Sequence, residues 1–179
     1  MNLPNKITIF RVIMIPFFVF FLLFPGIPYG QWIAEAIFVI ASLSDMVDGK
    51  IARKYNLITD FGKFMDPLAD KLLTASAMIC FVEMGRLPAW AVIIIISREF
   101  IISGFRLVAS DNGVVIAANM WGKVKTVFQM VMCVLLIVHI ENPFYRVLEI
   151  IAIAGAVILT VISLVIYLYD NKGVIKTTK

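Results

Sequence analysis

Residues 42–71 read SLSDMVDGKIARKYNLITDFGKFMDPLADK, a segment that places acidic, basic and small residues between two apolar runs. The apolar run before it begins near residue 32, and the run after it ends near residue 84. Each run, with its share of the quoted segment, has about the 20 residues that a helix needs to cross a bilayer. The segment therefore predicts a helical hairpin in a membrane, with the polar residues at the linker end of both helices.

The composition of the whole chain also indicates a membrane protein. Of 179 residues, 61% are hydrophobic and 16% are charged, whereas soluble domains average about 45–50% apolar and about 25% charged residues. Apolar runs recur along the whole length, so we expect one membrane domain over residues 1–179. Cys80 and Cys133 lie inside such runs, which predicts two buried thiols and excludes a disulfide scaffold.

Six segments have the length and hydropathy of a spanning helix, so the expected fold is an all-α integral membrane protein with six transmembrane helices. They cover residues 8–24, 32–52, 65–84, 88–108, 124–140 and 147–169. Fourteen of the sixteen lysines and arginines then fall on or toward one side of the membrane, and only Arg86 and Arg146 fall on the other.

By the positive-inside rule, both termini and the polar linkers face the cytoplasm. This predicts a multi-pass protein of the cell membrane whose polar site opens to the cytoplasm. The net charge of +4 is explained by contact with anionic membrane lipids, so no nucleic-acid partner is expected.

Four aspartates of the quoted segment form two pairs at helical spacing, Asp45 with Asp48 and Asp66 with Asp70. Residues three or four apart share one face of a helix, and a hairpin would bring the two faces together. Four clustered carboxylates without a cation would repel one another and take up protons. Their charges balance two divalent cations, and ligation by oxygen alone suits Mg²⁺ or Mn²⁺.

A plainer interpretation is a belt of ion pairs between these acids and the basic residues around them. It accounts for polar helix ends, but not for acids at positions where intact spanning helices need apolar residues. Nor does it account for the small residues Gly49, Ala52 and Gly62 among the acids. Gly49 allows a ligand to approach the backbone, and Gly62 allows two helices to approach each other. We therefore favour a site for metal and substrate.

The order Asp45-x2-Asp48-Gly49-x2-Ala52-Arg53-x8-Gly62-x3-Asp66-x3-Asp70 resembles the complete signature of the CDP-alcohol phosphatidyltransferase family. The resemblance implies a homodimeric enzyme with a cytoplasmic active site, in which an alcohol displaces CMP from CDP-diacylglycerol. By position it makes Asp45 and Asp66 bridging ligands of two metal ions, Asp48 a ligand of one ion, and Asp70 a ligand of the other ion and the catalytic base. The residues that it places on the CDP-lipid are Thr8, Arg11, Gly49, Ala52, Arg53 and Thr59.

The residue types agree with that chemistry. Attack on a pyrophosphate requires that the charge of its oxygens is neutralised and that the acceptor is held in line, and two metal ions can do both. It also requires a group that takes the proton of the attacking hydroxyl, and a carboxylate can do this. No serine, cysteine or histidine is placed to form a covalent intermediate, which favours direct displacement.

A second basic group bears on the identity of the acceptor. Arg98, Arg106, Lys123 and Lys125 are expected to converge in the inner half of the membrane. An acceptor that carries phosphate needs such cations, and arginine suits bidentate contact with phosphate. A structural interpretation of the two arginines, as snorkelling side chains or as partners of Glu99, is the alternative.

The pattern of Pro4-Asn5-x2-Thr8-x2-Arg11, Arg98-Glu99 and Gly122-Lys123-x-Lys125-Thr126 is similar to bacterial phosphatidylglycerophosphate synthases, a branch of the same family. The resemblance implies sn-glycerol 3-phosphate as the acceptor. Two alternatives stay open: another acceptor (inositol phosphate, serine or phosphatidylglycerol), or a divalent-cation transporter that uses the four aspartates. The concentration of polar residues toward one face and the lack of an internal repeat argue against the transporter.

Overall fold

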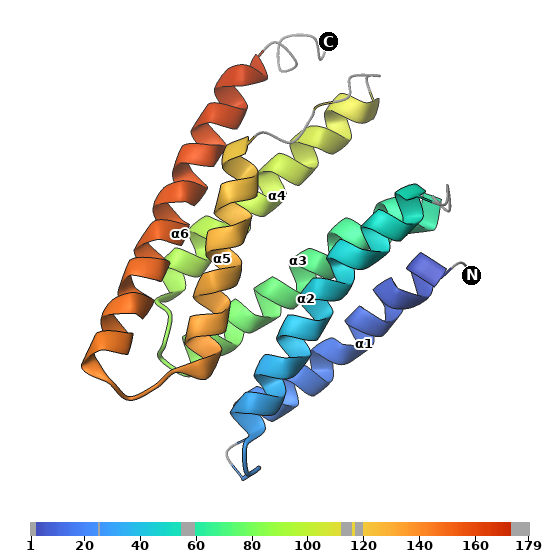
Figure 1. Cartoon of the computed structure of the whole chain (residues 1–179). Helices are drawn as coiled ribbons and strands as arrows, with labels where there is room; N and C mark the ends of the chain where they lie inside the picture. The colour runs from blue at the N-terminus through green and yellow to red at the C-terminus, as the bar shows by residue number, and fades with distance from the viewer. Residues whose placement is uncertain (1–2, 25, 55–59, 112–115, 117–119, 173–179) are drawn as a thin grey trace. The chain divides into compact units, whose positions relative to one another are not determined.

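Six α-helices make up the described part of the chain, which comprises residues 3–24, 26–54, 60–111, 116 and 120–172 of the computed structural model (Figure 1). In chain order they are α1 (Leu3–Leu23), α2 (Gly30–Lys54), α3 (Asp60–Glu83), α4 (Ala89–Asp111), α5 (Met120–Val138) and α6 (Pro143–Asp170). No residue in these ranges belongs to a β-strand. The expected all-α fold is therefore confirmed.

Three helices are long and apolar enough to cross a membrane by length and composition: α1 from Asn5 onward, α5 and α6. The apolar part of α2 is the shorter segment Gly30–Ser44, and α2, α3 and α4 all carry acidic and basic residues along their length. The chain thus has the apolar helices of a membrane protein, interrupted by charge in its middle helices.

Several helices begin before the apolar segments that the sequence predicts. Helix α1 begins at Leu3 and not near residue 8, α3 begins at Asp60 and not near residue 65, and α5 begins at Met120 and not near residue 124. The backbone hydrogen bonds of a helix do not depend on hydropathy, so a helix continues into polar sequence. Hydropathy therefore predicts the apolar part of each helix but not its ends.

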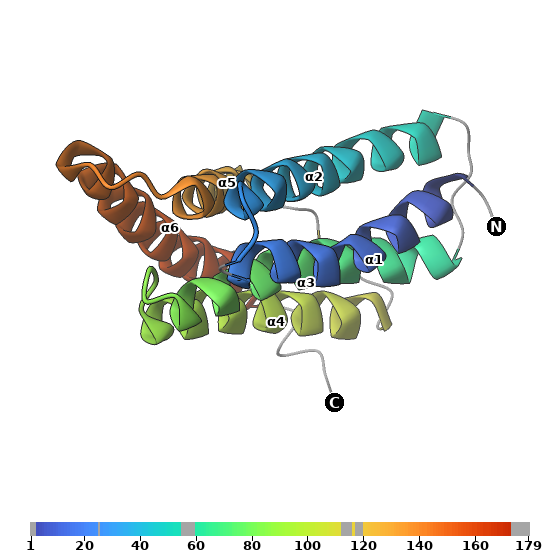
Figure 2. The ribbon, with the colours of Figure 1, turned by 90° about the horizontal axis from the view of Figure 1, so that it is seen from below.

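The chain divides into two compact units. The first unit comprises residues 1–86 and 133–139, and the second unit comprises residues 87–132 and 140–179. Within the first unit, α1 packs against both α2 and α3, as Figures 1 and 2 show. Within the second unit, α4 packs against α6.

The core of the first unit is apolar and closely packed. Ile15, Phe18 and Leu22 are buried at helical spacing on α1, and the rings of Phe18 and Phe38 lie 5.8 Å apart. Gly30, at the start of α2, allows the chain to come this close, because a Cβ atom there would lie 2.8 Å from the carbonyl oxygen of Phe21. A larger residue would force α1 and α2 apart at this end.

Side chains from elsewhere in the first unit cap the C-terminus of α5. Arg86 Nη1 donates hydrogen bonds to the carbonyl oxygens of Leu136, at 2.8 Å, and Ile137, at 3.3 Å. The side-chain amide of Gln31 donates to the carbonyl oxygen of Val138. The last carbonyls of a helix have no partner within the helix, and a cation near them also interacts favourably with the helix dipole. Arg86, predicted to lie on the outer side, therefore has a structural role.

In the second unit, α6 begins after Asn142, whose side chain accepts a hydrogen bond from the backbone N–H of Phe144. The buried residues of α6 recur every three or four positions, which defines one face of the helix. They are Glu149, Ala152, Ala156, Thr160, Ser163 and Tyr167. This face is unusually polar for an apolar helix, because four of its six members carry a polar group.

Replacing Arg86 by methionine should lower the thermal stability of the protein in detergent micelles. The change removes charge-assisted hydrogen bonds that contribute about 1.5–3 kcal/mol each when they are well formed, and it leaves carbonyl oxygens of α5 unsatisfied. The matched control is Arg146→Met, which changes an exposed arginine of α6 in the same way. Equal melting temperatures for the two variants would show that the cap contributes nothing.

Candidate functional site

The four aspartates of the predicted metal site lie on two helices of the first unit. Asp45 and Asp48 belong to the C-terminal part of α2, and Asp66 and Asp70 to the N-terminal half of α3. The helical spacing that the sequence predicts for each pair is therefore present in the backbone. The four carboxylates lie outside the part of the structure whose side chains are described, so the metal site itself stays a prediction.

The donors suit the expected ions in kind. All four residues carry carboxylates, and carboxylate oxygens are ligands that Mg²⁺ and Mn²⁺ prefer. Among the residues whose side chains are described, no group of three histidines, cysteines or acids could hold a metal ion. Cys80 and Cys133 are free and buried, as predicted.

The start of α1 lies beside this acidic part of α2. Arg11 Nε donates a hydrogen bond of 3.4 Å to Ser44 Oγ, and Ser44 directly precedes Asp45. Arg11 and Thr8, both predicted to contact the CDP-lipid, have no exposed surface. This arrangement brings part of the predicted lipid site next to the predicted metal site.

The other residues of the predicted CDP-lipid site are less fully described. Gly49, Ala52 and Arg53 lie on α2, but no side-chain position is described there. Thr59 lies outside the described residues. These four assignments therefore stay predictions.

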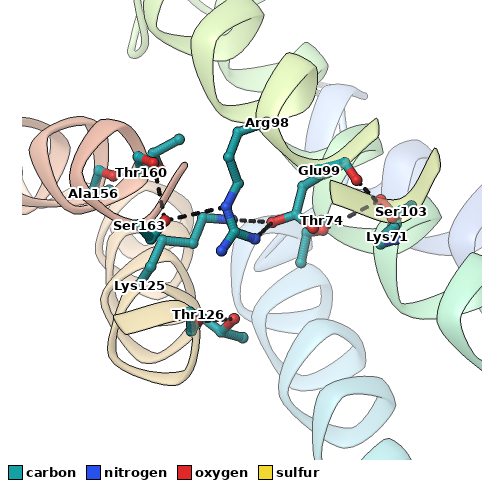
Figure 3. Close-up of polar contacts among 11 residues, drawn as sticks. Lys71, Thr74, Arg98, Glu99, Ser103, Lys125, Thr126, Ala156, Thr160 and Ser163 are labelled. Carbon is teal, nitrogen blue, oxygen red and sulfur yellow. Dashed lines mark hydrogen bonds and ion pairs between the residues drawn. The ribbon is translucent and has the colours of Figure 1, made fainter. Parts of the chain in front are cut away.

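In the second unit, the carboxylate of Glu99 joins two of the predicted acceptor-binding cations (Figure 3). Its Oε1 atom is 3.4 Å from Arg98 Nη1, and the ammonium group of Lys125 donates a hydrogen bond to the same oxygen. Lys125 has no exposed surface and Arg98 is 8% exposed. A buried cation without a partner is strongly unfavourable, so Glu99 makes the burial of both cations tolerable.

Helix α6 contributes polar partners to the same cluster. Arg98 Nε donates a hydrogen bond of 3.1 Å to Ser163 Oγ, and Ser163 Oγ donates in turn to the carbonyl oxygen of Thr160 at 2.9 Å. Figure 3 shows these contacts on the side of Arg98 away from Ser103, whose hydroxyl donates to the backbone of Glu99. Arg98 is thus held by side chains of both α4 and α6.

Arg106 extends the cluster at a more exposed position. Its guanidinium carbon lies 5.7 Å from the centre of the Tyr167 ring, and Arg98 interacts electrostatically with both Arg106 and Tyr167. Arg98, Arg106 and Lys125 therefore belong to one cluster, hereafter the cationic cluster, together with Glu99.

Lys123 differs from the other three cations. It is exposed, and no contact described in the structure joins it to the cationic cluster. Residues two apart on a helix do not face each other, so Lys123 and Lys125 point to different sides of α5. Its predicted role at the acceptor is not tested by these contacts.

Several polar residues in or beside the cationic cluster have no functional role predicted from the sequence. Glu99 enters as an alternative ion-pair partner and as part of the Arg98-Glu99 pattern, and the sequence patterns do not include Thr160, Ser163 or Tyr167. The sequence does contain a pattern that could have indicated the three residues of α6. They lie three or four positions apart on an apolar helix long enough to span a membrane, and polar residues inside such helices are often functional.

Removing the charge of Glu99 should destabilise the second unit more than removing that of Lys125. Glu99→Gln leaves two buried cations facing each other, whereas Lys125→Met leaves the Arg98–Glu99 pair intact. Breaking a fully buried pair costs about 3–5 kcal/mol, and we expect less here because 22% of the Glu99 side chain is exposed. The measurement is the melting temperature of each variant in detergent micelles.

The double variant Glu99→Gln/Lys125→Met provides the internal control. It removes both charges of the pair, so it should be more stable than Glu99→Gln alone. A double variant whose loss of stability equals the sum of the two single losses would show that the charges do not interact.

Residues 1–162 match the family described as CDP-alcohol phosphatidyltransferase. A Bacillus subtilis (strain 168) protein named CDP-diacylglycerol--glycerol-3-phosphate 3-phosphatidyltransferase is 44% identical, with 99% of this chain and 98% of the relative covered. A Haemophilus influenzae protein of the same name is 41% identical, with 96% and 94% covered.

A third relative carries a related name. It is a probable phosphatidylglycerophosphate synthase of Mycobacterium tuberculosis (strain ATCC 25618 / H37Rv), 38% identical, with 93% of this chain and 79% of the relative covered. The match over residues 1–162 includes the complete aspartate signature and all four residues of the cationic cluster. The chain belongs to the CDP-alcohol phosphatidyltransferase family.

Proposed function

We propose that this chain transfers a phosphatidyl group from CDP-diacylglycerol to sn-glycerol 3-phosphate, giving phosphatidylglycerophosphate and CMP. Similarity over nearly the full length to relatives named for this reaction supports the assignment. The observation that carries the choice of acceptor is the cationic cluster, in which Arg98, Arg106 and Lys125 outnumber the single acid Glu99. A site with excess positive charge suits an acceptor that carries a phosphate dianion.

The proposal includes an arrangement in the membrane. All six helices cross the bilayer, and both termini and the polar linkers lie on the cytoplasmic side. The described helices have 19 to 28 residues, and about 20 residues suffice to span the hydrocarbon core. The distribution of lysine and arginine supports this orientation.

Asp45, Asp48, Asp66 and Asp70 would hold two divalent cations, Mg²⁺ or Mn²⁺. When bound, these ions neutralise the phosphoryl oxygens of the CDP-lipid and favour ionisation of the acceptor hydroxyl. Asp70 accepts the proton of that hydroxyl. The acceptor oxygen forms a bond to the phosphorus that carries the diacylglycerol, and the bond from this phosphorus to CMP breaks, with its electron pair leaving on CMP.

The start of α1 holds the CDP-lipid beside the aspartates. Arg11 is fixed by Ser44, one residue before Asp45, and Thr8 lies one turn away on the same helix. Gly49, Ala52, Arg53 and Thr59 complete the proposed lipid contacts. In the cationic cluster, Arg98 and Arg106 bind the acceptor phosphate, with Lys123 and Lys125 as further candidates.

A homodimer is also part of the proposal, and it rests on the family resemblance. Small residues on a helix can form a packing face between two subunits. Gly155 and Ala156 do not support such a face here, because both pack against other residues of this chain. A Cβ atom at Gly155 would lie 3.1 Å from the ring of Phe128, and Ala156 is fully buried.

Asp45→Asn and Asp66→Asn should each abolish the reaction, because each removes a carboxylate proposed to bridge both cations. The measurement is incorporation of labelled glycerol 3-phosphate into lipid by the purified protein with CDP-diacylglycerol and Mg²⁺. Asp60→Asn is the matched control: it makes the same change on α3 outside the signature and should keep the activity. Near-native incorporation by either signature variant at saturating Mg²⁺ would refute the bridging roles.

Arg106→Ala should raise the KM for glycerol 3-phosphate by roughly tenfold, because a hydrogen bond to a charged group contributes about 1.5–3 kcal/mol. The KM for CDP-diacylglycerol should change much less. Arg106→Lys should recover only part of the loss if the arginine contacts the phosphate through two hydrogen bonds. It should recover most of the loss if only the positive charge matters.

The control for this series is Arg146→Ala, which removes an exposed arginine from α6 near its N-terminal end. It should leave both KM values unchanged. An unchanged KM for glycerol 3-phosphate in Arg106→Ala would remove Arg106 from the acceptor site.

A further inference from the structure

Tyr167 carries a buried hydroxyl that makes no hydrogen bond to any described residue. The side chain belongs to the buried face of α6, one turn beyond Ser163, and the residue is 2% exposed. Its hydroxyl oxygen is buried and has no hydrogen-bond partner among the described residues. Buried polar groups in proteins nearly always have a partner, and an exception calls for an explanation such as a ligand or a water molecule.

The surroundings of Tyr167 are positively charged. The Arg106 guanidinium lies 5.7 Å from the centre of the ring, and Arg98 interacts electrostatically with Tyr167. Phe105 packs edge-on against the same ring, with the two centres 5.8 Å apart. Two residues of α4, Phe105 and Arg106, therefore contact the ring, and Arg98 interacts with the same side chain.

An anion with several oxygens would suit both the phenol, which needs an acceptor, and the two arginines, which attract negative charge. Arginine and lysine side chains can only donate hydrogen bonds, so they cannot accept the proton of the Tyr167 hydroxyl. A phosphate group accepts several hydrogen bonds at once and is attracted by both arginines. The structure thus provides a donor and two charges for one phosphate.

We propose that the Tyr167 hydroxyl donates a hydrogen bond to a phosphate oxygen of the acceptor, which is held between Arg98 and Arg106. The inference rests on the proposed function and extends it by one binding residue. The same chemistry is offered by the phosphate of a membrane lipid headgroup, and the experiment below separates the two sources.

The test is Tyr167→Phe, which removes one oxygen atom and keeps the ring that packs against Phe105 and Arg106. Because the hydroxyl has no hydrogen-bond partner among the described residues, the melting temperature without acceptor should stay unchanged or rise. The KM for glycerol 3-phosphate should rise about fivefold or more, while the KM for CDP-diacylglycerol and kcat change little. A purely structural hydroxyl would give the opposite pattern, a lower melting temperature with an unchanged KM.

Tyr169→Phe is the matched control on the same helix. Tyr169 is 68% exposed, and its ring contacts Lys172. This variant should change neither the melting temperature nor any kinetic constant. Equal behaviour of the two variants would overturn the inference.

Binding of inorganic phosphate separates the two sources of phosphate and does not depend on turnover. Inorganic phosphate should raise the melting temperature of the wild-type protein, and of Tyr169→Phe, more than that of Tyr167→Phe. If the variants differ only in micelles that contain phosphatidylglycerol, the hydroxyl serves a lipid headgroup and the proposal is wrong.

The kinetic measurements also distinguish a failure of the role proposed for Tyr167 from a failure of the proposed function. If the wild-type protein uses glycerol 3-phosphate and Tyr167→Phe has the same KM, the role of Tyr167 fails alone. If the wild-type protein does not use glycerol 3-phosphate, the proposed function fails, and a selective effect of inorganic phosphate on the wild type still supports a phosphate contact at Tyr167.

Discussion

A buried charge needs a partner inside the protein or a ligand, because its removal from water is strongly unfavourable. In the second unit, one oxygen of Glu99 meets this need for both Arg98 and Lys125, and Ser163 adds a further contact to Arg98. The contacts of this carboxylate link α4 with α5, and Arg98 links α4 with α6. These charged and polar contacts thus join all three helices of the second unit.

The same constraint connects structure with function. Glu99 balances only part of the positive charge of the cluster, and the remainder is available to an anionic substrate. In the first unit the proposed site has the opposite sign, with four aspartates on α2 and α3 and the buried Arg11 beside them. A proposed metal site rich in acidic residues and a cationic cluster rich in basic residues suit a reaction that uses divalent cations and a phosphate-bearing acceptor.

Much of the fold and part of the candidate site could be predicted from the sequence, because hydropathy and helical spacing are local properties. The apolar helices and the helical placement of Asp45, Asp48, Asp66 and Asp70 follow from them. Helix ends could not be predicted in this way, since α3 continues through polar residues to Asp60. The role of Glu99 depends on which neighbours meet across helices, and spacing along one helix does not determine that. A role for the Tyr167 hydroxyl could not be predicted either, because the residue lies in the most apolar of the candidate spans.

The most direct test of the proposed function is an acceptor panel. Purified protein is supplied with CDP-diacylglycerol, Mg²⁺ and one of glycerol 3-phosphate, inositol phosphate, serine or phosphatidylglycerol, and release of CMP is measured. The account predicts rapid release with glycerol 3-phosphate and little release with the other three or without an acceptor. Faster release with any of the other three, or no release with any acceptor while the protein carries Mn²⁺ into proteoliposomes, would contradict it.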